Sequence, residues 1–178
     1  LNKKTRIEAE KIINSTDTNV KALAKVNQAS KVVNEFVYHE CLRLLKNKKV
    51  PVVVGGDHST PFGAIKAYAE HFKKFGILHI DAHSDTRKNY MGFEYSHASI
   101  MYNVMEKIPS VNVLVQVGIR DLCEQEYQYT KKHPKISVFY DRHIQDQKIN
   151  GKKWSELARE IVSKLPQNIY LSFDIDGL

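Results

Sequence analysis

Apolar and polar positions along the chain follow two different periods, and each period predicts a different kind of element. Between residues 20 and 46, apolar side chains recur at near-helical spacing and form one face: Leu23, Val26, Val33, Phe36, Val37, Leu44 and Leu45. This spacing predicts a long helix that packs through its apolar face. Similar but shorter patterns predict helices over residues 5–14, 59–75, 96–107 and 154–165, and a further helix that ends near Lys132.

Short apolar runs rich in β-branched residues predict strands between these helices. The runs cover residues 51–54, 77–80, 111–117, 136–140 and 169–173. Because strands and helices alternate, we expect an α/β protein with a parallel sheet, helices on both faces and right-handed connections. We interpret residues 1–178 as a single domain. Its first residue opens inside a helical pattern and its last residues directly follow a strand, so we expect it to be truncated at both ends.

Composition narrows the class of protein. Hydrophobic residues make up 42% and charged residues 26% of the chain, as in ordinary soluble globular proteins. No apolar run approaches the ~20 residues of a membrane span, and no secretory leader follows Leu1. Cys41 and Cys123 lie far apart without metal-type spacing. We therefore expect a reduced, cytoplasmic protein with two incidental thiols and no membrane partner.

The net charge of +7 raises the possibility of nucleic-acid binding. The lysines are scattered, however, and aromatic residues are not interleaved with them as a base-stacking surface requires. Charges at helix ends and on solvated helix faces explain this distribution better. We therefore predict no nucleic-acid partner.

Side chains of the metal-binding type follow three of the predicted strands, and the stretch after residue 80 is the richest in them. These residues are Asp57 and His58, then Asp81, His83 and Asp85, and finally Asp174 and Asp176. The C-terminal edge of a parallel sheet is where α/β folds place their ligand sites, so we expect the three groups to converge. Mixed imidazole and carboxylate ligands suit Mn, Zn, Fe or Ni, and the surplus of carboxylates favours Mn. So many ligands indicate a two-metal site with bridging carboxylates.

Each motif taken alone has a simpler interpretation. Asp57 could cap the helix that follows it, and Asp174 with Asp176 forms an Asp-x-Asp pair that is common in metal and phosphate sites. If residues 81–85 stayed extended, their two aspartates and histidine would project to one side and repel each other without a cation. The occurrence of all three motifs after strands favours a metal centre.

Three segments resemble the metal signatures of the ureohydrolase (arginase/agmatinase) family, in that family's order. They are Gly-Gly-Asp-His-Ser at 55–59, Asp-Ala-His-Ser-Asp at 81–85 and Ser-Phe-Asp-Ile-Asp at 172–176. Val-Gly-Ile-Arg at 117–120 resembles a further family segment, so the resemblance covers about residues 50–178. It implies a three-layer α/β/α fold with a parallel sheet, of the arginase/deacetylase type, and a centre of two Mn2+ ions.

The resemblance also implies a role for each ligand. One manganese would be held by His58, Asp81, Asp85 and Asp174, and the other by Asp81, His83, Asp174 and Asp176. Asp81 and Asp174 would then bridge the ions, and Asp57 would support its neighbouring ligand from behind. Asp85 would also orient the attacking nucleophile.

The loop after Asp85 resembles the agmatinase branch of the family. His97 falls where the family has a histidine near the substrate, proposed as an acid or proton shuttle; the simpler interpretation is a solvent-exposed histidine at a helix start. Arg87 could bind a substrate carboxylate, but a salt bridge that orders the loop is the interpretation we favour. The remaining histidines that lack such context are interpreted as structural or exposed: His39, His71, His79, His133 and His143.

The resemblance therefore implies a hydrolase of C–N bonds in linear amidines, which converts agmatine to putrescine and urea in polyamine biosynthesis. Arginase, guanidinobutyrase and formimidoylglutamase activities remain alternatives, as does a non-catalytic metal-binding fragment. A two-metal phosphoesterase would require phosphate-binding amides or an Arg/Lys clamp beside the ligands. The family usually forms trimers or hexamers, so we expect a homo-oligomer that binds a small guanidino substrate.

Overall fold

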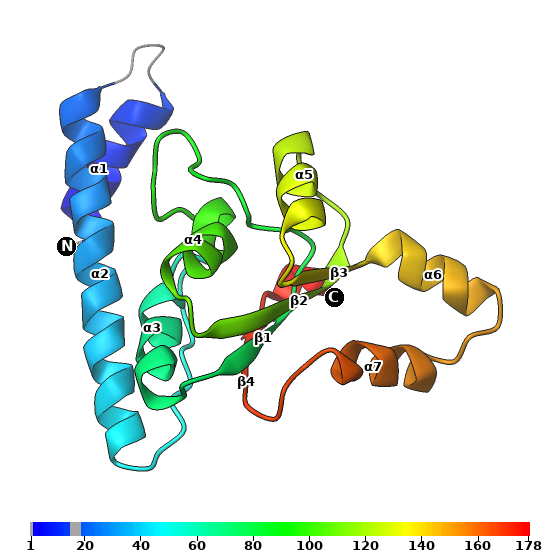
Figure 1. Ribbon diagram of the computed structural model, residues 1–178. Helices are drawn as coiled ribbons and strands as arrows, with labels where there is room; N and C mark the ends of the chain where they lie inside the picture. Colours follow the sequence, from blue (N-terminus) through cyan, green and yellow to red (C-terminus); the bar gives the residue numbers. More distant parts are fainter. Residues whose placement is uncertain (1, 15–18) are drawn as a thin grey trace.

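A four-stranded parallel sheet lies between helices in the computed structural model, which describes residues 2–14 and 19–178 (Figure 1). The strands are β1 (Phe75–Ile80), β2 (Val111–Ile119), β3 (Ile136–Tyr140) and β4 (Ile169–Phe173). Their order in the sheet is β3-β2-β1-β4, and every neighbouring pair is parallel. The predicted α/β class with a parallel sheet is confirmed, and the C-terminal ends of all four strands meet at one edge.

Helices precede the sheet and connect its strands. They are α1 (Asn2–Ile13), α2 (Val20–Lys46), α3 (Phe62–His71), α4 (Ile100–Lys107), α5 (Glu124–Lys132), α6 (Asp141–Ile149) and α7 (Trp154–Ser163), with 3-10 turns at His97–Ser99 and Ile175–Gly177. The predicted helix over 59–75 is too long, because β1 already begins at Phe75. Helix α6 is not predicted by the sequence pattern, since Ile144 is its one buried residue and leaves almost no apolar periodicity.

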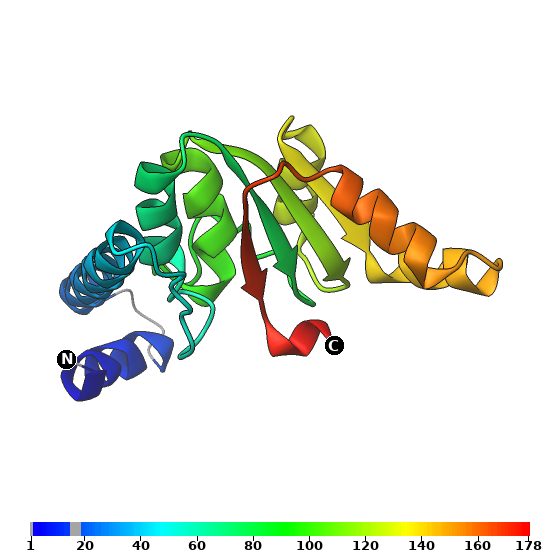
Figure 2. The same ribbon diagram turned by 90° about the horizontal axis from the view of Figure 1, so that it is seen from below.

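The two faces of the sheet are covered by different helices, as Figure 2 shows. On one face, α3 and α4 pack on β1 and β2 through a core that includes Ile65, Ile77, Met101 and Leu114. On the other face, α6 and α7 pack on β2 through Ile144, Leu157 and Ile161. Helix α2 lies outside α3, and its buried side chains include Tyr38 and Leu45. Its predicted packing face is wrong in part, because Val33 and Phe36 are 40% and 67% exposed. The cores on the two faces of the sheet hold in place the sheet edge at which the candidate site lies.

The predicted buried strand at residues 51–54 is wrong. This segment forms no ladder with the four strands of the described chain, and Val52 and Val54 are 79% and 91% exposed. Val53 alone packs inward, against the cluster between α2 and α3. The alternation of side chains expected of a strand is present, but a strand also needs a neighbouring backbone to pair with.

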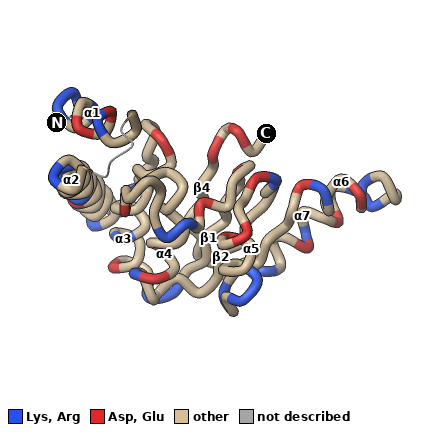
Figure 3. Tube along the Cα trace, turned by 90° about the horizontal axis from the view of Figure 1, so that it is seen from above, with Lys and Arg blue, Asp and Glu red and all other residues tan. Residues whose placement is uncertain are grey.

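The basic residues and the two cysteines are distributed as the sequence indicates. Lys and Arg are spread over helices at both ends of the molecule (Figure 3). Cys41 is buried, Cys123 is partly exposed, and both are free thiols. Within the described residues, no helix combines the length and the apolar character that crossing a lipid bilayer requires.

Candidate metal centre

Asp81 directly follows β1 and is held in place by backbone contacts from both neighbouring strands. Its N–H donates to the carbonyl of Val117 at 3.1 Å, while the N–H of Asp174 donates to the carbonyl of Ile80 at 2.9 Å. A side chain on Gly177 would place its Cβ 2.8 Å from the backbone nitrogen of Asp81, so only glycine fits there. Asp81 is 1% exposed, and its carboxylate therefore occupies a fixed position at the sheet edge.

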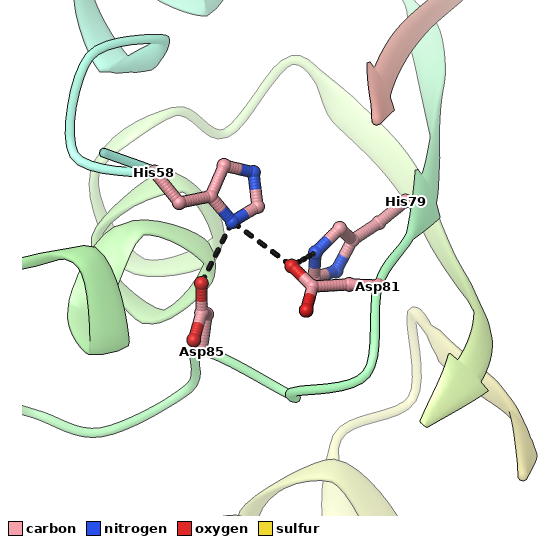
Figure 4. Close-up of side chains that lie close together, drawn as sticks. All are labelled: His58, His79, Asp81 and Asp85. Atoms are coloured by element: carbon pink, nitrogen blue, oxygen red, sulfur yellow. Dashed lines mark hydrogen bonds and ion pairs between the residues drawn. The ribbon is translucent and has the colours of Figure 1, made fainter. Parts of the chain in front are cut away.

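Four buried side chains converge beside Asp81, as Figure 4 shows: His58, His79, Asp81 and Asp85. The His58 Nδ1 lies 2.7 Å from Asp85 Oδ2 and 3.1 Å from Asp81 Oδ2. The His79 Nε2 lies 2.7 Å from the same Asp81 oxygen. One nitrogen or oxygen of each residue lies within 4.8 Å of the others, which is a compact set of donors for a cation.

A second, more exposed group shares Asp81. It consists of Asp81, His83 and Asp176, and His83 Nδ1 lies 3.1 Å from Asp176 Oδ2 and 3.5 Å from Asp81 Oδ1. One carboxylate thus presents Oδ2 to the buried group and Oδ1 to the exposed group. The two groups are adjacent and connected through Asp81.

The segment after Asp81 does not stay extended. Asp85 has a left-handed backbone with φ of 54°, and its carbonyl accepts hydrogen bonds from the N–H groups of Met101 and Tyr102 at the start of α4. This bend turns the Asp85 side chain toward His58, whereas His83 faces Asp176. Asp85 therefore belongs to the buried group, His83 to the exposed group and Asp81 to both. The three side chains do not project from one side of an extended strand.

Members of both groups line one cavity of about 350 Å3. The lining also includes Asp174, Asp57 and His97, which lie outside the two groups. The Asp174 carboxylate accepts a hydrogen bond from the N–H of Asp176 at 3.2 Å. Asp57 accepts from the N–H of Ser59 at 3.0 Å within a local turn, and it does not cap α3, which begins at Phe62. The His97 ring is exposed and packs edge-on against Tyr90, with centroids 5.5 Å apart.

A buried carboxylate on α5 anchors the loop that carries Asp85. Glu126 is 4% exposed, and it accepts hydrogen bonds from the N–H groups of Thr86 and Cys123, both at 3.0 Å. It also forms a salt bridge with Arg87 at 3.3 Å. The predicted loop-ordering salt bridge of Arg87 is therefore present, and its guanidinium additionally lies over the ring of Tyr90.

Burial and hydrogen bonding shift the pKa values of this cluster in opposite directions. Burial opposes charging of His58, but its hydrogen bonds to Asp81 and Asp85 outweigh burial and raise its pKa to about 9. Burial raises the pKa of the Asp81 carboxyl, yet hydrogen bonds with His58 and His79 outweigh it and hold that pKa well below the usual range. Burial also raises the pKa of Asp85. Without a cation, a protonated His58 therefore neutralises Asp81.

We expect the metal-free protein to lose stability as the pH rises from about 6.5 to about 9. The folded-state pKa of His58 is about 9, above its usual 6.5, so its stabilising charge is fully present below 6.5 and lost as the pH rises through 9. A shift of this size corresponds to roughly 3 kcal/mol. Urea unfolding between about pH 6 and pH 9.5 measures it. The slope should vanish in His58→Asn, and an unfolding free energy that is flat in the unchanged protein contradicts the prediction.

Two residues of the site were missed by sequence reasoning. His79 was interpreted as structural or exposed; it is fully buried, as the structural alternative requires, but its contact with Asp81 Oδ2 at 2.7 Å was not predicted. Its spacing of two from Asp81 on a strand was a usable signal, because such residues share a face. Glu126 lies 40 positions from Thr86 and carries no local signal that points to the loop.

The chain is similar in sequence to known proteins over most of its length. The sequence profile described as "Arginase family" matches residues 2–178. The N(1)-aminopropylagmatine ureohydrolase of Thermus thermophilus is 32% identical over 146 residues, which are 82% of this chain and 46% of that protein. This chain thus spans less than half the length of the relative.

Solved structures show the same fold. Arginase from Medicago truncatula has a TM-score of 0.69 at 28% identity, over 83% of this chain and 45% of that one. The agmatine ureohydrolase of Thermoplasma volcanium has a TM-score of 0.66 at 25% identity, over 84% of this chain and 47% of that one. The fold is therefore that of the arginase and agmatinase structures.

Proposed function

Because the chain belongs to the arginase family, we propose that it carries the metal-binding part of a binuclear manganese hydrolase. The reaction is cleavage of the guanidino group of a linear substrate, with agmatine converted to putrescine and urea. The observation that carries the proposal is the position of Asp81, whose two oxygens face two separate groups of donors. A carboxylate in this position can bridge two cations.

The donor set fits two such ions. His58, Asp81 and Asp85 would hold the buried ion, and His83, Asp81 and Asp176 the exposed one. Asp174, which lines the cavity beside both groups, would complete the set as a second bridge. The oxygens outnumber the nitrogens, and this favours manganese over zinc.

The chain's own residues would orient the nucleophile and give a proton to the leaving amine. When bound, two metal ions would lower the pKa of a shared water from about 15.7 toward neutrality and so provide a nucleophile. The Asp85 carboxylate, which lines the cavity, would accept a hydrogen bond from that nucleophile and so orient it. His97, on the wall of the same cavity, would give a proton to the leaving amine.

The environment of Arg87 favours agmatine over a substrate with a distal carboxylate. Its Nε lies 3.3 Å from Glu126 and its guanidinium lies over Tyr90, so its charge is already paired with a carboxylate of this chain. The similar proteins from Thermus thermophilus and Thermoplasma volcanium are named as ureohydrolases of aminopropylagmatine and agmatine. Both names point to amine-terminated guanidino substrates.

Urea release from agmatine by the manganese-loaded chain tests this function. Arginine and formiminoglutamate are run in parallel, and the manganese bound per chain is measured on the same sample. We expect two ions per chain and urea from agmatine but little from arginine. Two bound ions without urea from agmatine would contradict the proposed reaction. Formamide released from formiminoglutamate would move the assignment to that alternative.

A further inference from the structure

His79 is a completely buried imidazole that none of the proposed roles uses. The register of the sheet places it beside Gln116 on β2. Gln116 is also fully buried, and it links His79 to the loop that follows Asp81. The hydrogen bonds of this pair determine what His79 can do.

The orientation of the Gln116 amide follows from its contacts with Ser84. Its Nε2 lies 2.7 Å from the carbonyl oxygen of Ser84, and its Oε1 lies 3.2 Å from the Ser84 hydroxyl. A carbonyl oxygen can only accept, so the amide nitrogen must face it. The opposite orientation would bring two oxygens together. Both ends of the amide are therefore fixed.

This orientation determines which nitrogen of His79 carries the proton. The Gln116 Nε2 also lies 3.0 Å from His79 Nδ1. An amide nitrogen donates and does not accept, so Nδ1 must be the unprotonated, accepting nitrogen. The neutral ring then carries its hydrogen on Nε2, which donates to Asp81 Oδ2 at 2.7 Å.

The same contact holds the Asp81 carboxylate in a single orientation. Oδ2 accepts from His79, while Oδ1 accepts from the N–H of His83 at 2.6 Å. The carboxylate is thus held by a donor on each oxygen. In this tautomer His79 has no lone pair for a cation, because Nε2 carries the proton and Nδ1 faces Gln116. His79 therefore stands behind the metal ligand instead of joining it.

We infer that Gln116 and Asp81 together fix the tautomer of His79 and that His79, through its Nε2–H, is a positioning residue that aims Asp81 at the metal ions. The consequence for metal binding rests on the proposed function. The tautomer does not, and it can be observed without metal.

The first experiment reads the tautomer. The nitrogen chemical shifts of His79 are recorded in the metal-free, 15N-histidine-labelled protein and assigned by their loss in His79→Gln. We expect the pattern of a neutral ring protonated at Nε2. Gln116→Met, which has a similar volume but no amide, removes the hydrogen bond to Nδ1, so the Nδ1 shift should move while Nε2 stays protonated toward Asp81. A wild-type ring protonated at Nδ1 overturns the inference.

The second experiment reads the effect on Asp81 through calorimetric titration with Mn2+ alone. Loss of the partner behind a metal ligand typically costs about 10–100-fold in metal affinity. We expect that loss in Gln116→Met and in His79→Leu, and a smaller loss in His79→Gln, whose amide can still donate toward Asp81. Gln145→Met, an exposed change of the same type on α6, is the matched control and should bind as the unchanged protein does.

The outcomes separate the two proposals. If the unchanged protein binds Mn2+ and both Gln116→Met and His79→Leu bind it equally well, the positioning role is wrong and the metal centre stands. If the unchanged protein binds no Mn2+, the proposed metal centre fails, and the nitrogen spectrum still decides the tautomer. Should Gln116→Met not fold, as judged by circular dichroism, the pair His79→Leu and His79→Gln carries the test.

Discussion

Asp81→Asn is expected to abolish manganese binding at both positions and urea release with it. Asp81 is the one residue shared by the two groups of donors, and it is 1% exposed at a fixed place on the sheet edge. An amide offers one neutral oxygen and cannot bridge two cations as a carboxylate does. The loss should exceed the about 100-fold that removal of a supporting residue causes.

The measurement for Asp81→Asn combines manganese content per chain with the rate of urea release from agmatine. Asp146→Asn makes the same change in charge at an exposed position on α6, and it should leave both quantities unchanged. Two tightly bound ions in Asp81→Asn would exclude the bridging role. Circular dichroism separates loss of metal from loss of fold.

His97→Asn is expected to lower kcat for agmatine by about 10²–10⁴-fold, the usual contribution of a positioned acid or base. Asparagine keeps a polar group in the cavity wall but cannot transfer a proton. His97 lies outside both groups of candidate metal donors, so manganese content should not change. The combination of a low kcat with intact metal binding would separate proton transfer from ligand loss.

The matched control for His97→Asn is His143→Asn, an exposed histidine on α6. It should retain full activity. The competing interpretation of His97, a solvent-exposed histidine at a helix start, predicts the same result for both variants. Equal rates in the two variants would therefore reject the catalytic role and leave the proton on the leaving amine to another group.

The sequence determined the elements whose signals are local. The helical spacing of α2 and the β-branched runs of β1 to β4 repeat over a few neighbouring residues, so periodicity identifies these elements. Periodicity identified the packing face of α2 only in part, because Val33 and Phe36 are exposed while Tyr38 is buried. The ends of β1 and β4 and the acidic residues after them could also be predicted. Parallel strands place those ends at one edge, and this brought Asp81 and Asp176 together in the prediction.

Two elements show where local signals are not enough. Residues 51–54 have the pattern of a strand, yet no described strand pairs with them, because pairing depends on a neighbour and not on the segment itself. Helix α6 forms with a single buried residue, Ile144, so its stability comes from packing against the sheet and not from an amphipathic pattern.

What the sequence alone determined about this protein is the class of fold, the strand ends that carry the donors and the family that they resemble. The tertiary structure decided how those donors are divided. The left-handed turn at Asp85 sends it toward His58, the strand register places His79 beside Gln116, and Glu126 reaches the loop from α5. Periodicity depends on residues a few positions apart, whereas register, bends and buried hydrogen bonds depend on residues far apart in the sequence that only the packed fold brings together.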